Sequence, residues 1–255
     1  MATTTDADVE QSSHERVALV NGGSRGIGAA TVRRLAADGT DVAFTYLTSA
    51  DAAETLTAEY SDEEVTVEAI RADAGNLDEM TDLVERVVDR FGRLDVLVNS
   101  AGMTPMGPIE DVTDEDFEQT INVNVRAPFM LARAAAGVMD KGGRIVNIGS
   151  VWGEQVQLAN ISLYTLSKFA VTGLTRALAR DLGPKGITVN CVQPGPIDTD
   201  MNPADGEMAP VLVPMTALER YGEATEVADL IAFLAGPESS YVTGAVLNAD
   251  GGMNA

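Results

Sequence analysis

Seven short apolar stretches rich in β-branched residues alternate along this 255-residue chain with longer segments of helical periodicity. Alternation of this kind predicts a parallel sheet with helices on both faces. The run 96–98 is wholly apolar, which is typical of a strand buried on both sides. The expected strands are 17–20, 42–46, 65–70, 96–98, 144–148, 187–192 and 245–248. The expected helices are 27–38, 50–60, 77–91, 114–139, 163–182 and 225–235.

This pattern indicates a single α/β domain over residues 16–255, preceded by a flexible acidic leader over residues 1–15. Nothing between the strands resembles a linker that would divide the chain. The segment 194–220 breaks the alternation, because it carries five prolines and three methionines. A connection this long favours a substrate flap. A solvated insertion is the alternative.

The chain is strongly acidic, with 17 Lys and Arg against 39 Asp and Glu and a formal charge of −22. Nucleic acids and anionic membranes attract proteins through positive charge, so neither is expected as a partner. Acid excess suits a protein kept soluble in high salt, where self-repulsion is screened. A halophilic source and an acidic mesophilic enzyme are both open.

His14 is the only histidine and Cys191 the only cysteine. A histidine-based metal site or general base is therefore not expected, and we predict no metal. Cys191 lies in an apolar stretch, which favours a buried small hydrophobe. The leader has no apolar core of a secretory signal, and no segment approaches the ~20 apolar residues of a membrane helix. We expect a cytoplasmic protein.

A glycine-rich turn, Asn21-Gly-Gly-Ser-Arg-Gly-Ile-Gly28, follows the first expected strand and opens the first expected helix. Glycine is needed where the backbone turns tightly and where a pyrophosphate comes close to it. The N–H groups at a helix N-terminus, together with the helix dipole, favour bound phosphate. The turn therefore predicts a Rossmann fold that binds a nucleotide.

The spacing of this turn, G-x-x-x-G-x-G, resembles the classical short-chain dehydrogenase/reductase family, in its 3-oxoacyl-acyl-carrier-protein reductase-like branch. Asn21 stands where the family usually has threonine. Asp73-Ala74 matches the pair that contacts the adenine in the family. Asn99-Ser-Ala-Gly102 resembles its N-N-A-G motif, with Ser100 replacing the second Asn. The resemblance runs from about residue 16 to residue 252.

The end of the second strand bears on the choice of cofactor. NAD enzymes commonly place Asp or Glu there, but this chain has no acid between residue 44 and Asp51. Arg25 lies in the glycine turn, where a cation reaches a 2′-phosphate, and Thr48 and Ser49 offer hydroxyls. We therefore expect NADP(H). NAD(H) is the alternative if Arg25 is only a solvated surface charge.

Two side chains carry the expected chemistry. Tyr164 and Lys168 are four residues apart in an expected helix, so both lie on one face. Tyr164 can donate a proton, and the Lys168 ammonium stabilises the phenolate that remains. Ser150 ends the fifth strand, where its hydroxyl can hold a carbonyl oxygen. The family's fourth member is matched by Asn124, with Asn122 as the rival, and in the family this Asn orders a water that relays protons to the lysine.

The resemblance implies NADPH-dependent, reversible reduction of a ketone to a secondary alcohol. It also implies that residues 194–199 cover the nicotinamide and that Asp250-Gly-Gly252 lies in a region that commonly packs across a subunit interface. We therefore expect a homotetramer or homodimer. The expected cofactor residues are Gly22, Ser24, Arg25, Gly26, Ile27, Gly28, Tyr46, Thr48, Ser49, Asp73, Ala74, Asn99, Ala101, Gly102, Tyr164, Lys168, Pro194, Gly195, Ile197 and Thr199.

The substrate, a small carbonyl compound, is less defined by the sequence. No basic cluster marks a coenzyme A or phosphopantetheine group. The expected pocket residues are Met103, Trp152, Gln155, Val156 and Met201. Alternative functions are a catalytically silent nucleotide-binding regulator on the same fold and an NAD-dependent alcohol dehydrogenase. A dehalogenase-like relative is disfavoured, because such proteins lack the lysine and the glycine turn.

Overall fold

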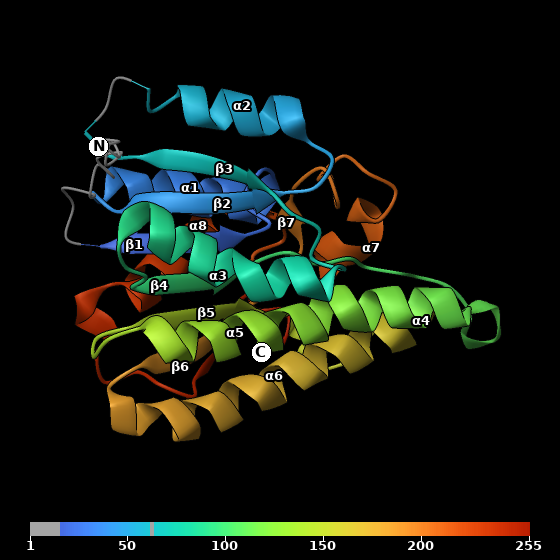
Figure 1. Cartoon of the computed structure of the whole chain (residues 1–255). Helices are drawn as coiled ribbons and strands as arrows, with labels where there is room; N and C mark the ends of the chain where they lie inside the picture. The colour runs from blue at the N-terminus through green and yellow to red at the C-terminus, as the bar shows by residue number, and fades with distance from the viewer. Residues whose placement is uncertain (1–15, 62–63) are drawn as a thin grey trace, which may run out of the picture.

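The computed structural model describes residues 16–61 and 64–255, and seven parallel strands in it form one sheet in the order β3-β2-β1-β4-β5-β6-β9 (Figure 1). The seven-stranded parallel sheet expected from the sequence is confirmed, with strand ends shifted by one or two residues. The acidic leader and His14 lie outside the described residues. The strands are β1 Val17–Asn21, β2 Asp41–Tyr46, β3 Val67–Arg71, β4 Val96–Asn99, β5 Arg144–Ile148, β6 Thr188–Pro194 and β9 Val246–Ala249.

Helices cover both faces of this sheet, as the uninterrupted burial of its central strands requires. One apolar core lies between the sheet and α1, α2 and α8, and a second lies between the sheet and α3, α5 and α6. The amphipathic α3 shows the sequence cause, because its buried Met80, Leu83, Val84, Val87 and Phe91 recur at helical spacing. The helix bounds are α1 Gly26–Ala37, α2 Ala50–Ala58, α3 Leu77–Phe91, α6 Ser162–Leu182 and α8 Ala224–Ala235.

The prediction of one continuous helix over 114–139 is wrong. The structure divides it into α4 (Asp114–Ile121), a π-helical turn (Asn122–Arg126) and α5 (Ala127–Val138). Pro128 has no N–H for the regular ladder, and a π-turn absorbs the mismatch. The turn places Asn124 in the interior, whereas Asn122 accepts a surface hydrogen bond from Arg126.

The segment 194–220 is folded. Its β7 (Ile197–Asp198) pairs with β8 (Gly222–Glu223), and it carries the short helix α7 (Ala209–Leu212) followed by the 3₁₀ turn Val213–Met215. Arg220 at its end binds both carboxylate oxygens of Glu226 in α8 at 2.7 Å, and this pairing lowers the pKa of Glu226 to about 2. The segment is thus fastened to β8 near its start and to α8 at its end.

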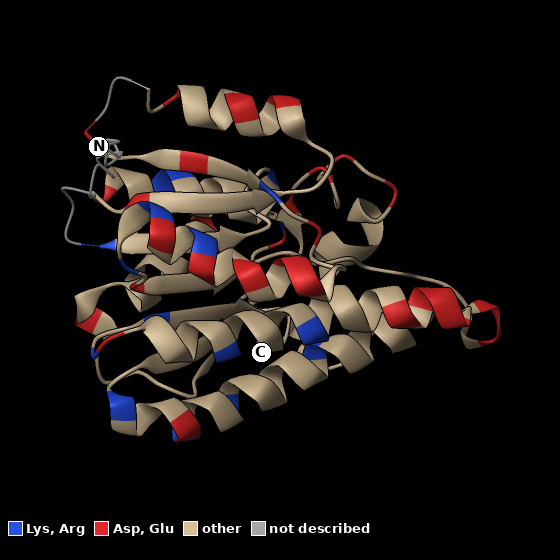
Figure 2. Ribbon diagram, viewed as in Figure 1, with Lys and Arg blue, Asp and Glu red and all other residues tan. Residues whose placement is uncertain are grey.

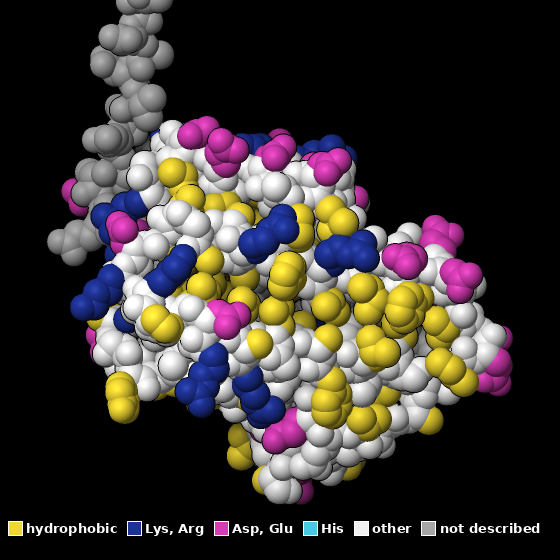
Figure 3. All heavy atoms as spheres, turned by 60° about the horizontal axis from the view of Figure 1, so that its bottom comes forward, with side chains coloured by type: hydrophobic (Ala, Val, Ile, Leu, Met, Phe, Trp, Pro, Cys, Tyr) yellow, Lys and Arg dark blue, Asp and Glu magenta, His cyan; other side chains and the backbone are white. Residues whose placement is uncertain are grey.

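The molecular surface is uneven in character. Acidic residues are spread over the helices, including α2, α3 and α4 (Figure 2). Hydrophobic side chains gather on one half of the face shown in Figure 3. The exposed large apolar residues of α4, α5 and α6 are Phe117, Phe129, Val138, Leu166 and Phe169. Within residues 16–61 and 64–255, no helix combines the length and apolar character needed to cross a membrane.

Candidate active site

The site lies where the strand order reverses. β1 pairs with β2 on one side and with β4 on the other. The connections that follow the carboxyl ends of β1 and β4 therefore run toward opposite edges of the sheet. Open α/β sheets bind ligands in the crevice at such a point. Asn21, Asn99, Ser150 and Pro194 all lie at or just beyond the ends of strands at this edge. The topology therefore collects the motifs that the sequence scatters.

The glycine turn between β1 and α1 is tightly packed. Gly22 has φ of 81°, and an added Cβ would lie 2.6 Å from the Ala101 backbone. An added Cβ on Gly28 would lie 2.0 Å from the carbonyl oxygen of Gly22. Gly22 N donates to Thr45 Oγ1 at 2.8 Å, and Gly23 N donates to the Thr45 carbonyl at 2.9 Å. A larger residue at either position would push α1 away from β1. The close packing of the turn therefore requires glycine at both positions.

The N-terminus of α1 is open to an anion. Among the described residues, no side chain caps it and no acid occupies its first turn. By contrast, α4 and α8 carry capping boxes and first-turn acids. Unpaired N–H groups and the positive end of the helix dipole favour phosphate at such a terminus. The turn and helix present here thus fit the pyrophosphate of a dinucleotide.

The side of the site next to β2 carries the groups expected to read a ribose. Arg25 is half exposed at the start of α1, and its Nη1 lies 3.8 Å from Asp200 of the segment 194–220. Ser49 immediately precedes α2, and its hydroxyl makes no capping hydrogen bond. Tyr46 ends β2, Thr48 is exposed, and no Asp or Glu side chain stands at the strand end. Asp73, after β3, accepts from Gly75 N at 2.8 Å.

Buried side-chain amides link β4 to α6, the helix that carries Tyr164 and Lys168. Asn99 Nδ2 donates to Asn147 Oδ1 at 2.8 Å, and Asn147 Nδ2 donates to Thr175 of α6 at 2.9 Å. Asn99 Oδ1 is buried and has no hydrogen-bond partner within the described ranges. An unpartnered buried acceptor at the crevice is consistent with a ligand donor there.

Asn124 fixes the loop that follows β4. Its Oδ1 accepts from Met103 N at 2.9 Å, and its Nδ2 donates to the Met103 carbonyl and to Ser167 Oγ, both at 2.9 Å. Ser167, which the sequence did not single out, donates in turn to the Tyr164 carbonyl at 2.7 Å. Gly102 lies beside both Asn124 Oδ1 and Lys168 Nζ. The Asn therefore joins the Met103 loop to the helix of the expected acid.

Tyr164, Lys168 and Ser150 converge at the ends of β5 and α6. Lys168 is buried, its Nζ donates to the Ile148 carbonyl at 3.0 Å, and it lies 5.5 Å from the centroid of the Tyr164 ring. Ser150 Oγ is buried and accepts from Trp152 N at 3.2 Å, which leaves its hydroxyl proton available. Trp152 packs edge-on against Tyr164, with centroids 6.1 Å apart.

The segment 194–220 closes over the glycine turn. Thr199 Cγ2 would lie 3.1 Å from a Cβ on Gly26, and Ile197 is buried beneath it. Gly195 packs so closely on Asp250 that an added Cβ would lie 2.7 Å from its Cα. Met201 is exposed, and its sulfur accepts from Thr104 of the loop after β4 at 3.5 Å. The segment thereby spans the site from the glycine turn to the Met103 loop.

The expected substrate-pocket residues do not all face one space. Trp152 lies against Tyr164 and the apolar cluster of Val151, Leu212, Tyr221 and Met253. Gln155 instead donates to the Asn254 carbonyl at 3.3 Å, and Val156 is exposed. Met103 is partly buried beside a cavity of about 400 Å³ that also includes Asp111, Asp116 and Leu163. This cavity adjoins the N-terminal end of α6.

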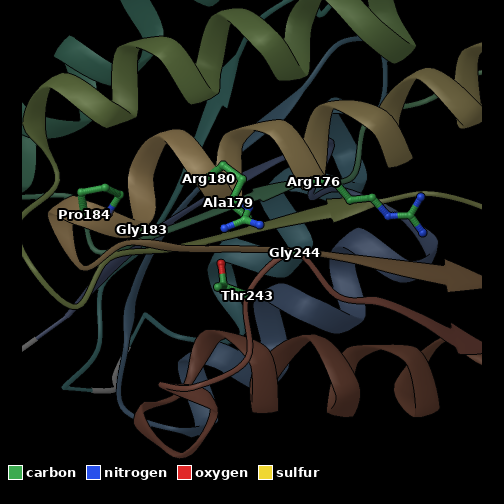
Figure 4. A pocket seen from close by; sticks show the side chains of 7 residues that line it. All are labelled: Arg176, Ala179, Arg180, Gly183, Pro184, Thr243 and Gly244. Carbon is green, nitrogen blue, oxygen red and sulfur yellow. The ribbon is translucent and has the colours of Figure 1, made fainter.

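A larger cavity, of about 540 Å³, lies elsewhere (Figure 4). Arg176, Arg180, Pro184 and Thr243 line it near the C-terminal end of α6, away from the Tyr164 end. None of the expected site residues borders it. Cys191, in β6, is equally separate from the chemistry, because it is buried and its burial raises the pKa of its thiol to about 11. The expected catalytic residues therefore lie apart from this cavity.

The fold combines a parallel sheet, a helix whose uncapped N-terminus suits a phosphate, and a Tyr–Lys pair at the same edge of the sheet. This combination is typical of nucleotide-binding oxidoreductases. A family model described as enoyl-(acyl carrier protein) reductase matches residues 22–254. The short-chain dehydrogenase from Burkholderia cenocepacia J2315, solved in complex with NADP, is 48% identical, with a TM-score of 0.92 over 96% of this chain and 99% of that one. The protein belongs to the short-chain dehydrogenase/reductase family.

Curated relatives differ in their stated roles. The cyclic-di-GMP-binding biofilm dispersal mediator protein of Escherichia coli K12 is 45% identical over 240 residues, which is 94% of this chain and 98% of the relative. The 3-oxoacyl-[acyl-carrier-protein] reductase of Synechocystis is 39% identical over 241 residues, which is 93% and 96%. Similar proteins have also been solved in complex with NADPH.

Proposed function

We propose that the protein is an NADP(H)-dependent reductase that converts a ketone to a secondary alcohol by reversible hydride transfer. The observation that carries this proposal is the convergence of Ser150, Tyr164 and Lys168 beside an uncapped α1 N-terminus at the switch point of the sheet. The solved relatives that hold NADPH or NADP support the choice of cofactor. Ketones, with 3-oxoacyl thioesters among them, are the substrate class.

Each residue has a defined task in this proposal. Bound NADPH supplies the hydride. Tyr164 donates its phenolic proton to the carbonyl oxygen, and the Ser150 hydroxyl donates a hydrogen bond to the same oxygen. The Lys168 ammonium, held by the Ile148 carbonyl, stabilises the phenolate. Asn124 acts as a positioning residue, because it fixes both polar backbone groups of Met103.

Arg25 is proposed as the reader of the 2′-phosphate. Arg25→Ala removes one charge-assisted hydrogen bond, so KM for NADPH should rise about 10- to 100-fold. KM for NADH should stay within about twofold, because NADH has no 2′-phosphate. Initial-rate kinetics with both cofactors measure the two effects. Arg86→Ala, which removes an exposed arginine from α3, is the matched control, and equal losses for NADPH and NADH in Arg25→Ala would contradict this role.

A second candidate function is a catalytically silent nucleotide-binding regulator on the same fold. The name of the E. coli relative, a cyclic-di-GMP-binding mediator, favours it. The intact Ser150, Tyr164 and Lys168 favour the enzyme. Titration of the protein with cyclic-di-GMP and with NADPH, followed by the fluorescence of Trp152, separates ligand binding from turnover. Binding of cyclic-di-GMP without oxidation of NADPH would favour the regulator.

The experiment that tests the enzyme is the loss of nicotinamide absorbance with NADPH and NADH in parallel. The substrates are simple ketones, β-ketoesters and acetoacetyl thioesters, each at low and multimolar salt because the chain is so acidic. Consumption of NADPH well above NADH supports the proposal and identifies the class of ketone. A preference for NADH supports the NAD-dependent alcohol dehydrogenase instead. Bound but unconsumed cofactor with every ketone argues against the enzyme.

We also propose that the protein forms a cytoplasmic homotetramer or homodimer through the outer face of α4, α5 and α6. Exposed apolar side chains on all three helices, among them Phe117, Phe129 and Phe169, favour a protein interface. Phe169→Glu should place a buried charge in that interface and shift the protein to monomers. Light scattering measures the mass. A Phe169→Glu variant that keeps the wild-type mass, or a monomeric wild type, would contradict this interface.

A further inference from the structure

The Asp250-Gly-Gly252 motif has no role in the chemistry described so far, yet its backbone is unusual. Gly251 and Gly252 follow β9 with φ of 62° and 80°, in the left-handed region that favours glycine. A Cβ on Gly252 would lie 2.8 Å from Ala217 Cβ. The two glycines therefore turn the chain back and let residues 250–255, here called the post-β9 segment, lie against the end of the segment 194–220.

Asp250 gives the post-β9 segment its shape. Its carboxylate accepts from Gly252 N at 2.9 Å and from Asn254 N at 3.0 Å. Leu218 N donates to the Gly251 carbonyl at 3.0 Å, which ties the segment to the end of 194–220. The start of 194–220 is tied beside it, because Gly195 N donates to the Ala249 carbonyl at 3.1 Å. Both ends of the covering segment thus rest on residues 249–251.

Asn254 fastens the other wall of the site, which is the loop 151–157 after Ser150. Its Nδ2 donates to the Val151 carbonyl at 2.9 Å, and its Oδ1 accepts from Gln157 Nε2 at 2.9 Å. Its own carbonyl accepts from Gln155 at 3.3 Å. One residue therefore holds the start and the end of the loop.

The point of attachment adjoins the expected chemistry. Val151 stands between Ser150, whose hydroxyl accepts from Trp152 N, and Trp152, whose ring packs on Tyr164. Residues 154–157 of this loop are exposed, and exposed loops open locally at low free energy unless they are tied down. A loop released from Asn254 would carry Trp152 away from Tyr164 and loosen the hydrogen-bonded turn at Ser150.

We propose that Asn254 is a positioning residue that holds the loop 151–157 so that Ser150 and Trp152 face the substrate carbonyl. This role rests on the proposed ketone reductase. The post-β9 segment thereby joins both walls of the substrate site, the covering segment 194–220 and the loop 151–157. In this role Asn254 acts through the loop 151–157 and not by binding the substrate or the cofactor itself.

Trp152 gives a direct readout, because it is the only tryptophan of the chain and lies in this loop. Asn254→Ala in the full-length protein should raise acrylamide quenching of Trp152 about twofold and leave the Kd for NADPH within about twofold, since the glycine turn is untouched. KM for the ketone should rise about tenfold with kcat within about twofold. Gln157→Ala leaves the hydrogen bond from Asn254 to the Val151 carbonyl in place. It should therefore raise the quenching of Trp152 and the KM for the ketone by less than Asn254→Ala does.

Ser239→Ala is the matched control. It removes a buried hydroxyl that donates to the Leu234 carbonyl at 2.9 Å at the end of α8, so it destabilises the fold without touching the loop. Asn254→Asp keeps the oxygen that accepts from Gln157 but replaces the donor to the Val151 carbonyl with a second carboxylate oxygen, which repels that carbonyl. It should therefore raise the quenching of Trp152 and the KM for the ketone as much as Asn254→Ala does. If Asn254→Ala does not fold, Gln157→Ala and Asn254→Asp decide.

Unchanged quenching of Trp152 in Asn254→Ala overturns the proposal, whether or not a ketone substrate is known. Equal increases in Asn254→Ala and Ser239→Ala also overturn it, because general loosening then explains both. If no ketone is reduced but quenching rises only in the Asn254 and Gln157 variants, the loop clasp stands and the reductase proposal fails. The two failures are therefore distinguishable.

Discussion

Tyr164→Phe should lower kcat/KM for ketone reduction about 10³-fold, within the range for removal of a positioned general acid. The change deletes one oxygen and keeps the ring, so the edge-on contact with Trp152 remains. Lys168 stays anchored, because its Nζ donates to the Ile148 carbonyl and not to the phenol. The Kd for NADPH, measured by quenching of Trp152, should therefore stay within about threefold.

The test compares a large loss of kcat/KM with a nearly unchanged Kd for NADPH in the same variant. A variant that misfolded would lose both. Tyr241→Phe is the matched control, because the Tyr241 side chain is fully exposed and loses the same oxygen. Its kcat/KM should equal that of the wild type. Retention of most of the rate by Tyr164→Phe would assign the proton to another donor and remove the central residue of the mechanism.

The sheet could be predicted from sequence because each of its strands carries its own signal. The seven strands are indicated by apolar, β-branched runs that lie between glycines and segments of helical periodicity. Connections between parallel strands are right-handed, which leaves few possible strand orders in the sheet. The positions of Asn21, Asn99, Ser150 and Pro194 at strand ends followed from that order. The sequence pattern therefore predicts that these site residues lie at one edge of the sheet.

The contacts that complete the site have no such local signal. The π-turn at Asn122–Arg126 interrupts a segment whose helical periodicity continues on both sides, so the pattern predicted one helix. The two-residue strands β7 and β8 form only because the ends of the covering segment meet in three dimensions. The sequence offers Gln155 as a candidate pocket residue, and its hydrogen bond to the Asn254 carbonyl spans 99 positions. Long-range pairing of polar side chains is invisible to periodicity.

Gly28→Ala should have the second-largest effect, through shape and not through chemistry. The added methyl carbon would lie 2.0 Å from the Gly22 carbonyl oxygen and 3.1 Å from Gly23 Cα. Both neighbours are backbone atoms, so no side-chain rotation relieves the overlap, and either the turn or α1 must move. Overpacking of this kind costs about 1–3 kcal/mol. The same displacement removes the α1 N-terminus from the phosphate position.

The expected result is a Kd for NADPH raised about 100-fold, because misplacing one phosphate site forfeits charge-assisted hydrogen bonds of about 1.5–3 kcal/mol. Titration calorimetry gives the Kd, and thermal unfolding without cofactor gives the cost to the fold. Gly137→Ala is the matched control, since Gly137 is exposed in α5 with nothing within 4 Å of an added Cβ. It should stabilise the protein by about 0.5–1 kcal/mol without changing NADPH affinity. A Gly28→Ala variant with wild-type NADPH affinity would show that the cofactor phosphates bind somewhere other than the start of α1, and it would leave the open helix terminus without a ligand.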